Sequence, residues 1–196
     1  MPEPRADAQR NRRNLLAAAE SAFNTRGAGA SLDDIARAAG VGNATLYRHF
    51  PTRQQLIDAV YEARIGALCV LAEQMRAAEP AGAALPVWLR AVVDHISGSR
   101  GLRDAFVDAH HLGAGSGAPQ LAEWHRMTDD AAVPLLHDAQ AAGTAHPDLR
   151  AAELMALVAA VAHAGGGDPG DARRLLGFVL DGVGRRPGEV RPRRTP

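Results

Sequence analysis

The segment Ser31–Phe50 constrains the fold of this chain more than any other part of its sequence. Its first half carries one apolar stripe at helical spacing, formed by Leu32, Ile35, Ala36 and Ala39. Ser31 is suited to cap the start of this helix, and Asp34 can reach back toward it as in a capping box. Gly40 can take the positive φ that ends a helix. The pattern therefore predicts a short helix followed by a glycine turn.

The residues after the turn predict a second short helix with one buried and one exposed face. Leu46 and Phe50 lie one turn apart and should face inward, whereas Ala44 and Arg48 lie on the opposite side. Two short helices joined by a glycine turn are typical of a helix-turn-helix, which places its second helix in the major groove of DNA. Polar residues at 43, 45 and 48 can hydrogen-bond bases or phosphates. Periodicity alone also fits two ordinary surface helices.

The order of residues in this segment closely resembles the TetR family of transcriptional regulators. The family string D-I-A-x-x-A-G-V-x-x-x-T-L-Y-x-H-F is matched at residues 34–36, 39–41, 45–47 and 49–50, and Arg53 supplies the basic residue that follows. The match covers about residues 10–65, and the remainder agrees only in helical pattern. One departure is the Gly27–Ala30 loop, which lacks the aromatic residue often found after its first glycine.

This resemblance implies an all-α protein with an N-terminal three-helix helix-turn-helix domain and a helical-bundle domain for ligand binding and dimerisation. We place the first domain at residues 9–69, with its motif at about 31–50, and the second at residues 70–186. Double-stranded operator DNA is the expected partner. The residues expected to contact it are Ser31, Gly42, Asn43, Ala44, Thr45, Tyr47, Arg48, His49 and Arg53.

The distribution of charge fits such a partner, although the formal net charge is zero. Residues 1–53 hold eight Arg and five acidic residues, whereas residues 54–184 hold nine Arg and sixteen acidic residues. A basic N-terminal part attached to a more acidic remainder can present one positively charged face to phosphates. The early arginines Arg5, Arg10, Arg12 and Arg13 can reach the DNA backbone or a minor groove, or form a solvated arm. Residues 187–196 form a basic, proline-rich tail that we expect to be disordered.

Composition also indicates in which cellular compartment the protein is found. Cys69 is the only cysteine, which excludes a disulfide within one chain. The sequence has no run of 18 uncharged apolar residues and no apolar segment of the signal-peptide kind near its start. These features predict a cytoplasmic protein without a membrane partner.

Helical periodicity continues to the end of the predicted bundle, with no period-2 strand pattern. Beyond the motif, Pro134 should kink or divide one of the helices. The expected helices span about residues 10–25, 52–77, 85–97, 102–111, 120–142, 151–164 and 171–184.

The last two of these helices predict a dimer interface. The segment 154–162 is apolar all round, and a helix of this kind needs cover on every side. The following helix has a broad apolar stripe. We expect both helices to pair with their copies in a second subunit, although a central core helix is the alternative. The predicted interface residues are Leu154, Val158, Val161, Leu175, Val179 and Leu180.

Apolar and histidine side chains of the second half can line a cavity for a small-molecule effector. Plain core packing explains the same residues, and only the resemblance favours a cavity. The segment Gly113–Pro119, rich in glycine, can gate it. The predicted pocket residues are Leu68, Trp88, Val92, His95, Phe106, His110, Trp124 and Met127.

Catalytic and metal chemistry find little support in the sequence. Ser116 lacks the flanking glycines and the preceding strand of a nucleophile elbow. His95, Asp108 and His110 offer a zinc set, but scattered histidines in a bundle are more often surface or lining residues. We expect no catalytic residue, cofactor or metal. The sequence therefore predicts a homodimeric repressor that an effector releases from a pseudo-palindromic operator; a helical-bundle enzyme and a protein-interaction module with an incidental helix-turn-helix are the alternatives.

Overall fold

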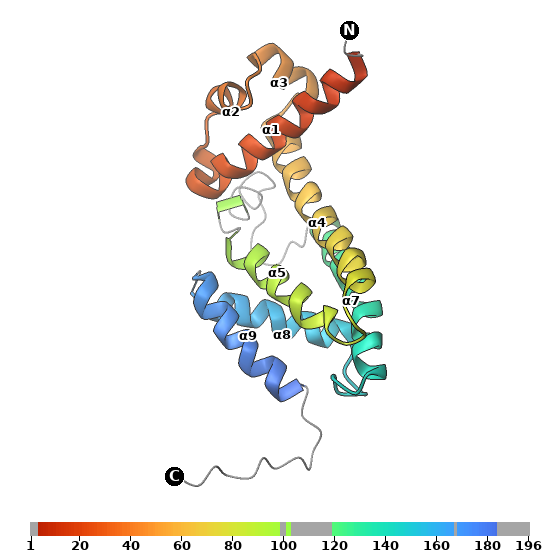
Figure 1. The fold of residues 1–196 in the computed structure, drawn as a ribbon. Coiled ribbons are helices and arrows are strands. Elements are labelled where there is room, and N and C mark those ends of the chain that lie inside the picture. Colours follow the sequence, from red (N-terminus) through yellow and green to blue (C-terminus); the bar gives the residue numbers. More distant parts are fainter. Residues whose placement is uncertain (1–3, 99–100, 103–118, 167, 184–196) are drawn as a thin grey trace. The chain divides into compact units, whose positions relative to one another are not determined.

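The computed structural model describes residues 4–98, 101–102, 119–166 and 168–183, and the regular elements of these ranges are helices joined by turns. The all-α prediction is therefore confirmed over the described part of the chain. In chain order the elements are α1 (Pro4–Arg26), η1 (Gly27–Gly29), α2 (Leu32–Ala38), α3 (Asn43–His49), α4 (Arg53–Ala78), α5 (Ala84–Gly98), α7 (Pro119–Ala141), α8 (Ala151–Ala164) and α9 (Pro169–Val183) (Figure 1).

The chain divides into two compact units. The first contains Met1–Ala67 and Gly98–Arg126, and the second contains Leu68–Ser97 and Met127–Pro196. Both α4 and α7 contribute one part to each unit. The division in α4 lies near the predicted boundary at residue 69, but the first unit also takes residues from the middle of the chain. The predicted domain limits therefore stay a prediction.

The first unit is built around the long helix α1. This helix packs against α2, and α2 packs against α3 (Figure 1). Leu15, Ala19 and Phe23 form the buried stripe of α1 at helical spacing. They share the core of this unit with side chains from the other helices, namely Ile35, Leu46, Phe50, Leu56 and Ile57.

Gly101 and Leu102 join this unit from the middle of the chain. Leu102 is fully buried. A Cβ atom at Gly101 would lie 2.4 Å from the carbonyl oxygen of Phe23 and 2.6 Å from that of Asn24, at the end of α1. Only a glycine allows so close an approach to the backbone. Most of the helix predicted for residues 102–111 lies outside the described residues.

The second unit has its own hydrophobic core, to which α5 contributes a large share of the buried residues. Trp88 on α5 is fully buried, and its indole Nε1–H donates to the carbonyl oxygen of Leu68 at 2.8 Å. Side chains from α4, α7, α8 and α9 complete this core, including Ala72, Leu135, Leu154, Val158 and Leu176. Pro134 does not divide α7, which runs as one helix.

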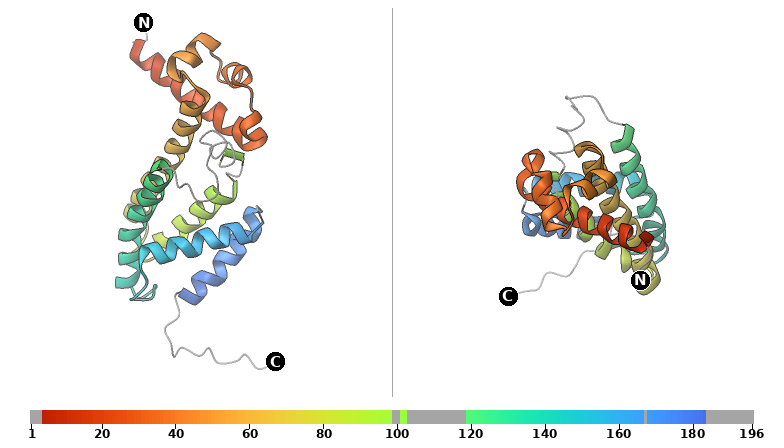
Figure 2. Two further views of the ribbon diagram at one scale, coloured as in Figure 1. Left: turned by 180° about the vertical axis from the view of Figure 1, so that it is seen from behind. Right: turned by 90° about the horizontal axis from the view of Figure 1, so that it is seen from above.

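The helices α8 and α9 lie side by side in the second unit (Figure 2). They come together at Gly165, where an added Cβ atom would lie 2.7 Å from that of Ala172. The backbone N–H of Arg150 donates to the Glu153 carboxylate at 3.1 Å and so caps the start of α8.

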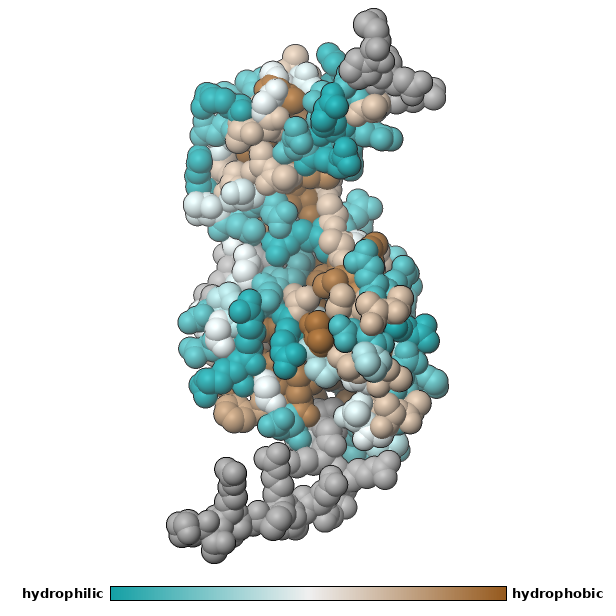
Figure 3. Space-filling view, in the orientation of Figure 1, coloured by the Kyte–Doolittle hydropathy of each residue, from teal (hydrophilic) through white to brown (hydrophobic). Residues whose placement is uncertain are grey.

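Two ion pairs connect helices at the surface of this unit. Arg76 on α4 donates to Asp138 on α7 at 2.6 Å, and Arg173 on α9 forms a bidentate pair with Asp94 on α5 at 2.6 and 2.8 Å. The Arg76 guanidinium lowers the pKa of Asp138 below its ordinary value, through a hydrogen bond above all. Hydrophobic residues are also exposed among hydrophilic ones on the face of this unit drawn in Figure 3.

Among the described helices, none is long and apolar enough to cross a membrane. The described residues also contain no group of three or more His, Cys, Asp and Glu side chains that could hold a metal ion.

Candidate nucleic-acid interface

Helix α2 begins and ends with the capping groups that its sequence predicts. The Ser31 hydroxyl accepts a hydrogen bond from the backbone N–H of Asp34 at 3.3 Å. At the other end Gly40 has a φ of +71°, and its N–H donates to the carbonyl of Arg37 at 3.1 Å. The next N–H, that of Val41, donates to Ala36 at 3.0 Å. This pair of bonds is a Schellman motif, and it directs the chain into the turn before α3.

Helix α3 has the buried face predicted for the second helix of the motif. Leu46 and Phe50 are almost completely buried, and the N–H of Phe50 donates to the carbonyl of Leu46 at 2.8 Å. The opposite face is exposed, and 48% of the Tyr47 surface is accessible to solvent. The exposed residues of this segment are Gly42, Asn43, Ala44, Tyr47 and Arg48, while Thr45 and His49 are partly buried at its edges.

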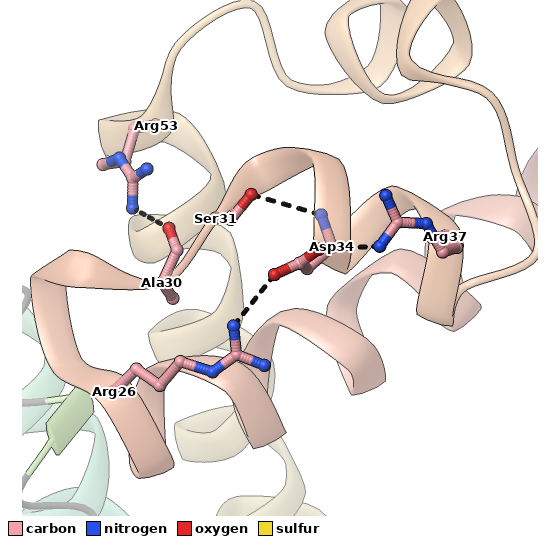
Figure 4. Close-up of polar contacts among 6 residues, drawn as sticks. All are labelled: Arg26, Ala30, Ser31, Asp34, Arg37 and Arg53. Carbon is pink, nitrogen blue, oxygen red and sulfur yellow. Dashed lines mark hydrogen bonds and ion pairs between the residues drawn. The ribbon is translucent and has the colours of Figure 1, made fainter.

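The Asp34 carboxylate binds two arginines, whereas the sequence predicted that it would cap the start of α2. It accepts hydrogen bonds from Arg26 at 3.0 Å and from Arg37 at 2.8 Å, so it connects the end of α1 to α2 (Figure 4). These two bonds, that of Arg26 first, hold the pKa of Asp34 below its ordinary value. Two guanidinium groups compete better for a carboxylate than one backbone N–H does, because charge-assisted bonds are stronger.

Arg53 holds the start of α4 against the segment that precedes α2. Its guanidinium donates to the carbonyl oxygen of Ala30 at 2.7 Å (Figure 4), and the side chain is partly buried. Ser31 follows Ala30 directly, so this bond stabilises the position of the α2 cap. The predicted phosphate contact of Arg53 stays a prediction, since part of its hydrogen-bonding capacity serves the fold.

The early arginines belong to a helix rather than to an extended arm. α1 begins at Pro4, so Arg10, Arg12 and Arg13 lie within it. Arg10 pairs with Asp7. The Arg12 guanidinium lies over the Phe50 ring at 5.5 Å from its centroid, which is a cation–π contact between α1 and the end of α3.

One contact of this surface joins Asn43 to Asp33 and was not predicted from the sequence. The Asn43 side-chain amide donates to the Asp33 carboxylate at 2.7 Å, and both residues are exposed. Asn43 opens α3 and Asp33 lies in the first turn of α2. The two residues are ten positions apart on different helices, so no local spacing rule indicates their contact.

The second unit contains an open cavity of about 700 Å³ along α4 and α7. Its walls combine small or apolar residues with charged ones: Cys69, Ala72, Glu73, Arg76, Ala77, Met127, Asp130, Ala131, Pro134 and Asp138. Burial and the carboxylates of Glu73 and Asp130 raise the pKa of the Cys69 thiol. Among the predicted pocket residues that the structure describes, only Met127 lines this cavity.

The other predicted pocket residues have different surroundings. Leu68, Trp88 and Val92 are packed inside the core of the second unit, and His95 is partly buried on α5. Trp124 belongs to the first unit, where it is buried and stacks on the Tyr61 ring with centroids 4.6 Å apart. Phe106, Asp108, His110 and residues 113–118 of the predicted loop lie outside the described residues, and Pro119 is the first residue of α7.

The predicted dimer interface needs a correction at two positions. Leu154 and Val158 are fully buried in the core of their own chain and offer no surface to a partner. Val161 is also buried, whereas Leu175, Val179 and Leu180 are only partly covered. An all-apolar helix does not reveal by periodicity which side its own chain covers.

Two large apolar side chains on the same helices remain exposed. Leu157 on α8 is 43% exposed, and Phe178 on α9 is 63% exposed with the Arg174 guanidinium 5.8 Å from its ring centroid. Each is adjacent in sequence to a predicted interface residue, Val158 or Val179, so both helices of the predicted interface do expose apolar side chains, and the interface itself stays a prediction.

The arrangement of α1, α2 and α3 defines the class of protein, a helix-turn-helix DNA-binding regulator. Residues 15–60 match the family model of bacterial regulatory proteins of the tetR family, and residues 79–185 match that of the C-terminal domain of SbtR-like transcriptional regulators. A comparison with curated proteins finds no match.

Solved structures of similar proteins agree with the family models. The chain is 35% identical to a TetR transcriptional regulator from Streptomyces coelicolor, with a TM-score of 0.76 over 88% of this chain and 97% of that one. It is 34% identical to a TetR regulatory protein from Mycobacterium vanbaalenii, with a TM-score of 0.75 over 92% and 99%. The chain therefore belongs to the TetR family of DNA-binding transcriptional regulators.

A more distant structure has the same fold. The TetR-like regulator LfrR from Mycobacterium smegmatis, in complex with proflavine, is 22% identical, with a TM-score of 0.58 over 89% of this chain and 97% of that one.

Proposed function

We propose that this regulator is a cytoplasmic homodimer that represses transcription, and that it binds a pseudo-palindromic operator through the exposed face of α3. The observation that carries the proposal is the contrast between the two faces of α3. Leu46 and Phe50 bury one face, while Ala44, Tyr47 and Arg48 are exposed on the other. A helix-turn-helix uses such a face in the major groove, and two-fold symmetry of the protein requires two matching half-sites.

The dimer in this proposal forms through α8 and α9. Leu157 and Phe178 expose large apolar side chains, and Val179 and Leu180 are partly exposed on α9. Large apolar side chains that are exposed on two adjacent helices favour a protein partner. Val70 and Val133 are also exposed, but they lie on other helices and are explained as isolated apolar residues at the surface.

An effector site along α4 and α7 completes the proposal. A volume of about 700 Å³ lies in the range of small-molecule sites, and LfrR provides a case of this fold in complex with proflavine. α4 begins beside the segment before α2 and continues into the second unit, so a ligand on α4 can bias DNA binding. By reciprocity, operator DNA then weakens effector binding. No catalytic step enters the proposal.

Selection from a library of random DNA duplexes tests the DNA-binding part of the proposal. The parent protein should enrich a two-fold symmetric sequence whose half-sites lie about one helical turn, or a multiple of it, apart. Enrichment of no sequence, or of one without symmetry, would contradict the proposal.

A thermal-shift screen of small molecules tests the effector site. Compounds that stabilise the parent should lose their effect in Ala77→Phe, which fills the cavity wall, and keep it in Ala78→Phe, which changes the next exposed position outside the wall. Equal responses of the two variants would place the effector elsewhere.

A further inference from the structure

The contact between Asp33 and Asn43 connects the two helices of the reading motif on their exposed side. Asn43 is the first residue of α3, and its amide nitrogen donates to Asp33 at 2.7 Å. An ionised carboxylate only accepts hydrogen bonds, whereas an amide has a donor end and an acceptor end. The carboxylate therefore decides which end of the Asn43 amide faces α2. The nitrogen faces α2, and the oxygen Oδ1 is turned away from Asp33.

The Asn43 amide keeps one donor and one acceptor that Asp33 does not use. One amide hydrogen serves Asp33, so one N–H donor and the Oδ1 acceptor remain for a ligand. Among the bases, adenine offers the matching pair in the major groove, with an amino group at N6 and an acceptor at N7. Guanine and thymine present no donor there, and cytosine presents a donor without the neighbouring acceptor.

Asp33 is otherwise unfavourable on a surface that meets DNA. Its carboxylate is exposed and adds negative charge close to where α3 would approach the phosphates. It also lies in the first turn of α2, where a carboxylate stabilises the helix terminus modestly. An acid at this place lowers affinity for every DNA sequence alike, so a benefit to sequence selection accounts better for its contact with Asn43.

We propose that Asp33 is a specificity-determining positioning residue, which orients the Asn43 amide so that each half-site is selected for adenine at the base pair that Asn43 meets. This inference rests on the proposal that α3 reads the operator. It predicts two effects of opposite sign when Asp33 is removed: selection at one base pair decreases, while affinity for unrelated DNA increases.

The test combines selection from random duplexes with a double-mutant cycle. The parent, Asp33→Ala, Asn43→Ala and the double variant are each used to select from the same library. Both single variants should lose about five- to hundredfold preference for adenine at one and the same position of each half-site, because one bidentate contact discriminates by about this much. The double variant should lose no more than either single variant, because both changes remove the same interaction.

Two further variants separate orientation from charge. Asp7→Ala removes the same charge from the same unit, but Asp7 pairs with Arg10 and not with Asn43, so its selected sequence should equal that of the parent. Asp33→Asn keeps the size of the side chain but can turn either end of its amide to Asn43, so it should retain only part of the preference for adenine. Circular dichroism confirms that each variant is folded.

The inference is wrong if Asp33→Ala binds all duplexes more tightly and selects the parental sequence, since Asp33 would then act through charge alone. It is equally wrong if Asn43→Ala selects the parental sequence, or if a folded Asp33→Ala binds no DNA. If the proposed function itself is wrong, the result differs from these, because the parent protein would then enrich no symmetric sequence.

Discussion

Tyr47 and Arg48 extend from the exposed face of α3, and neither contributes to the buried core. Replacement of either by Ala should therefore leave the free energy of unfolding within about 0.5 kcal/mol of the parent value. We expect each variant to weaken operator binding by about 1–3 kcal/mol, as measured by gel shift at constant salt. Arg90→Ala, at an exposed position in the second unit, serves as the control. Parental affinity in both α3 variants would show that α3 is not the reading helix.

Asp34 connects α1 to α2 through Arg26 and Arg37, and both bonds lower its pKa in the folded protein. A carboxyl whose pKa is lowered by folding stabilises the protein above its unfolded pKa, near 3.8. That contribution is lost as the pH falls through the folded pKa. We therefore expect Asp34→Asn to have a lower melting temperature than the parent at pH 7. At the lowest pH that keeps both proteins folded, the two melting temperatures should be equal. A difference in melting temperature that stays constant over this range would rule out the ion pairs as its cause.

Capping signals made α2 and the turn after it predictable from sequence. Ser31 and Gly40 act locally, over three or four residues, and the structure confirms both. The contacts of Asp33 and Arg53 were not predictable in this way, because each connects segments that only tertiary packing brings together. The burial of Leu154 and the exposure of Leu157 were not predictable for a related reason, since the segment 154–162 has no polar residue to mark its exposed side.

Gly101 lies very close to the backbone at the end of α1, and a substitution at this position tests that close approach. A side chain at this position would meet backbone carbonyl oxygens at 2.4 and 2.6 Å, which cannot move away without disturbing α1. We expect Gly101→Ala to destabilise the protein by about 1–3 kcal/mol in chemical denaturation, as overpacked sites do. Gly98→Ala is the matched control, because an added Cβ atom there meets nothing within 4 Å. Equal stability of the two variants would contradict the close approach.

Assembly of the whole molecule depends on which apolar residues of α8 and α9 are free to meet a partner. Phe178→Glu places a charge on an exposed position, so we expect a folded monomer by light scattering and circular dichroism, with reduced operator affinity. Val158→Glu buries an unpaired charge in the core of one chain, so it should unfold the protein by a loss of about 3–5 kcal/mol. A parent protein that binds its operator as a monomer would refute this description of the dimer.

Photochemical crosslinking tests directly whether the exposed face of α3 contacts operator DNA. Azidophenylalanine has nearly the shape of tyrosine and phenylalanine, so it can replace Tyr47 on α3 or Phe178 on α9 while disturbing the protein little. With the duplex that the parent selects, irradiation of the protein with the probe at position 47 should crosslink to DNA at two symmetric positions. The protein with the probe at position 178 should crosslink to a second protein chain instead. A crosslink to DNA from position 178, or none from position 47 in a protein that still binds the duplex, would show that α3 does not read the operator as proposed.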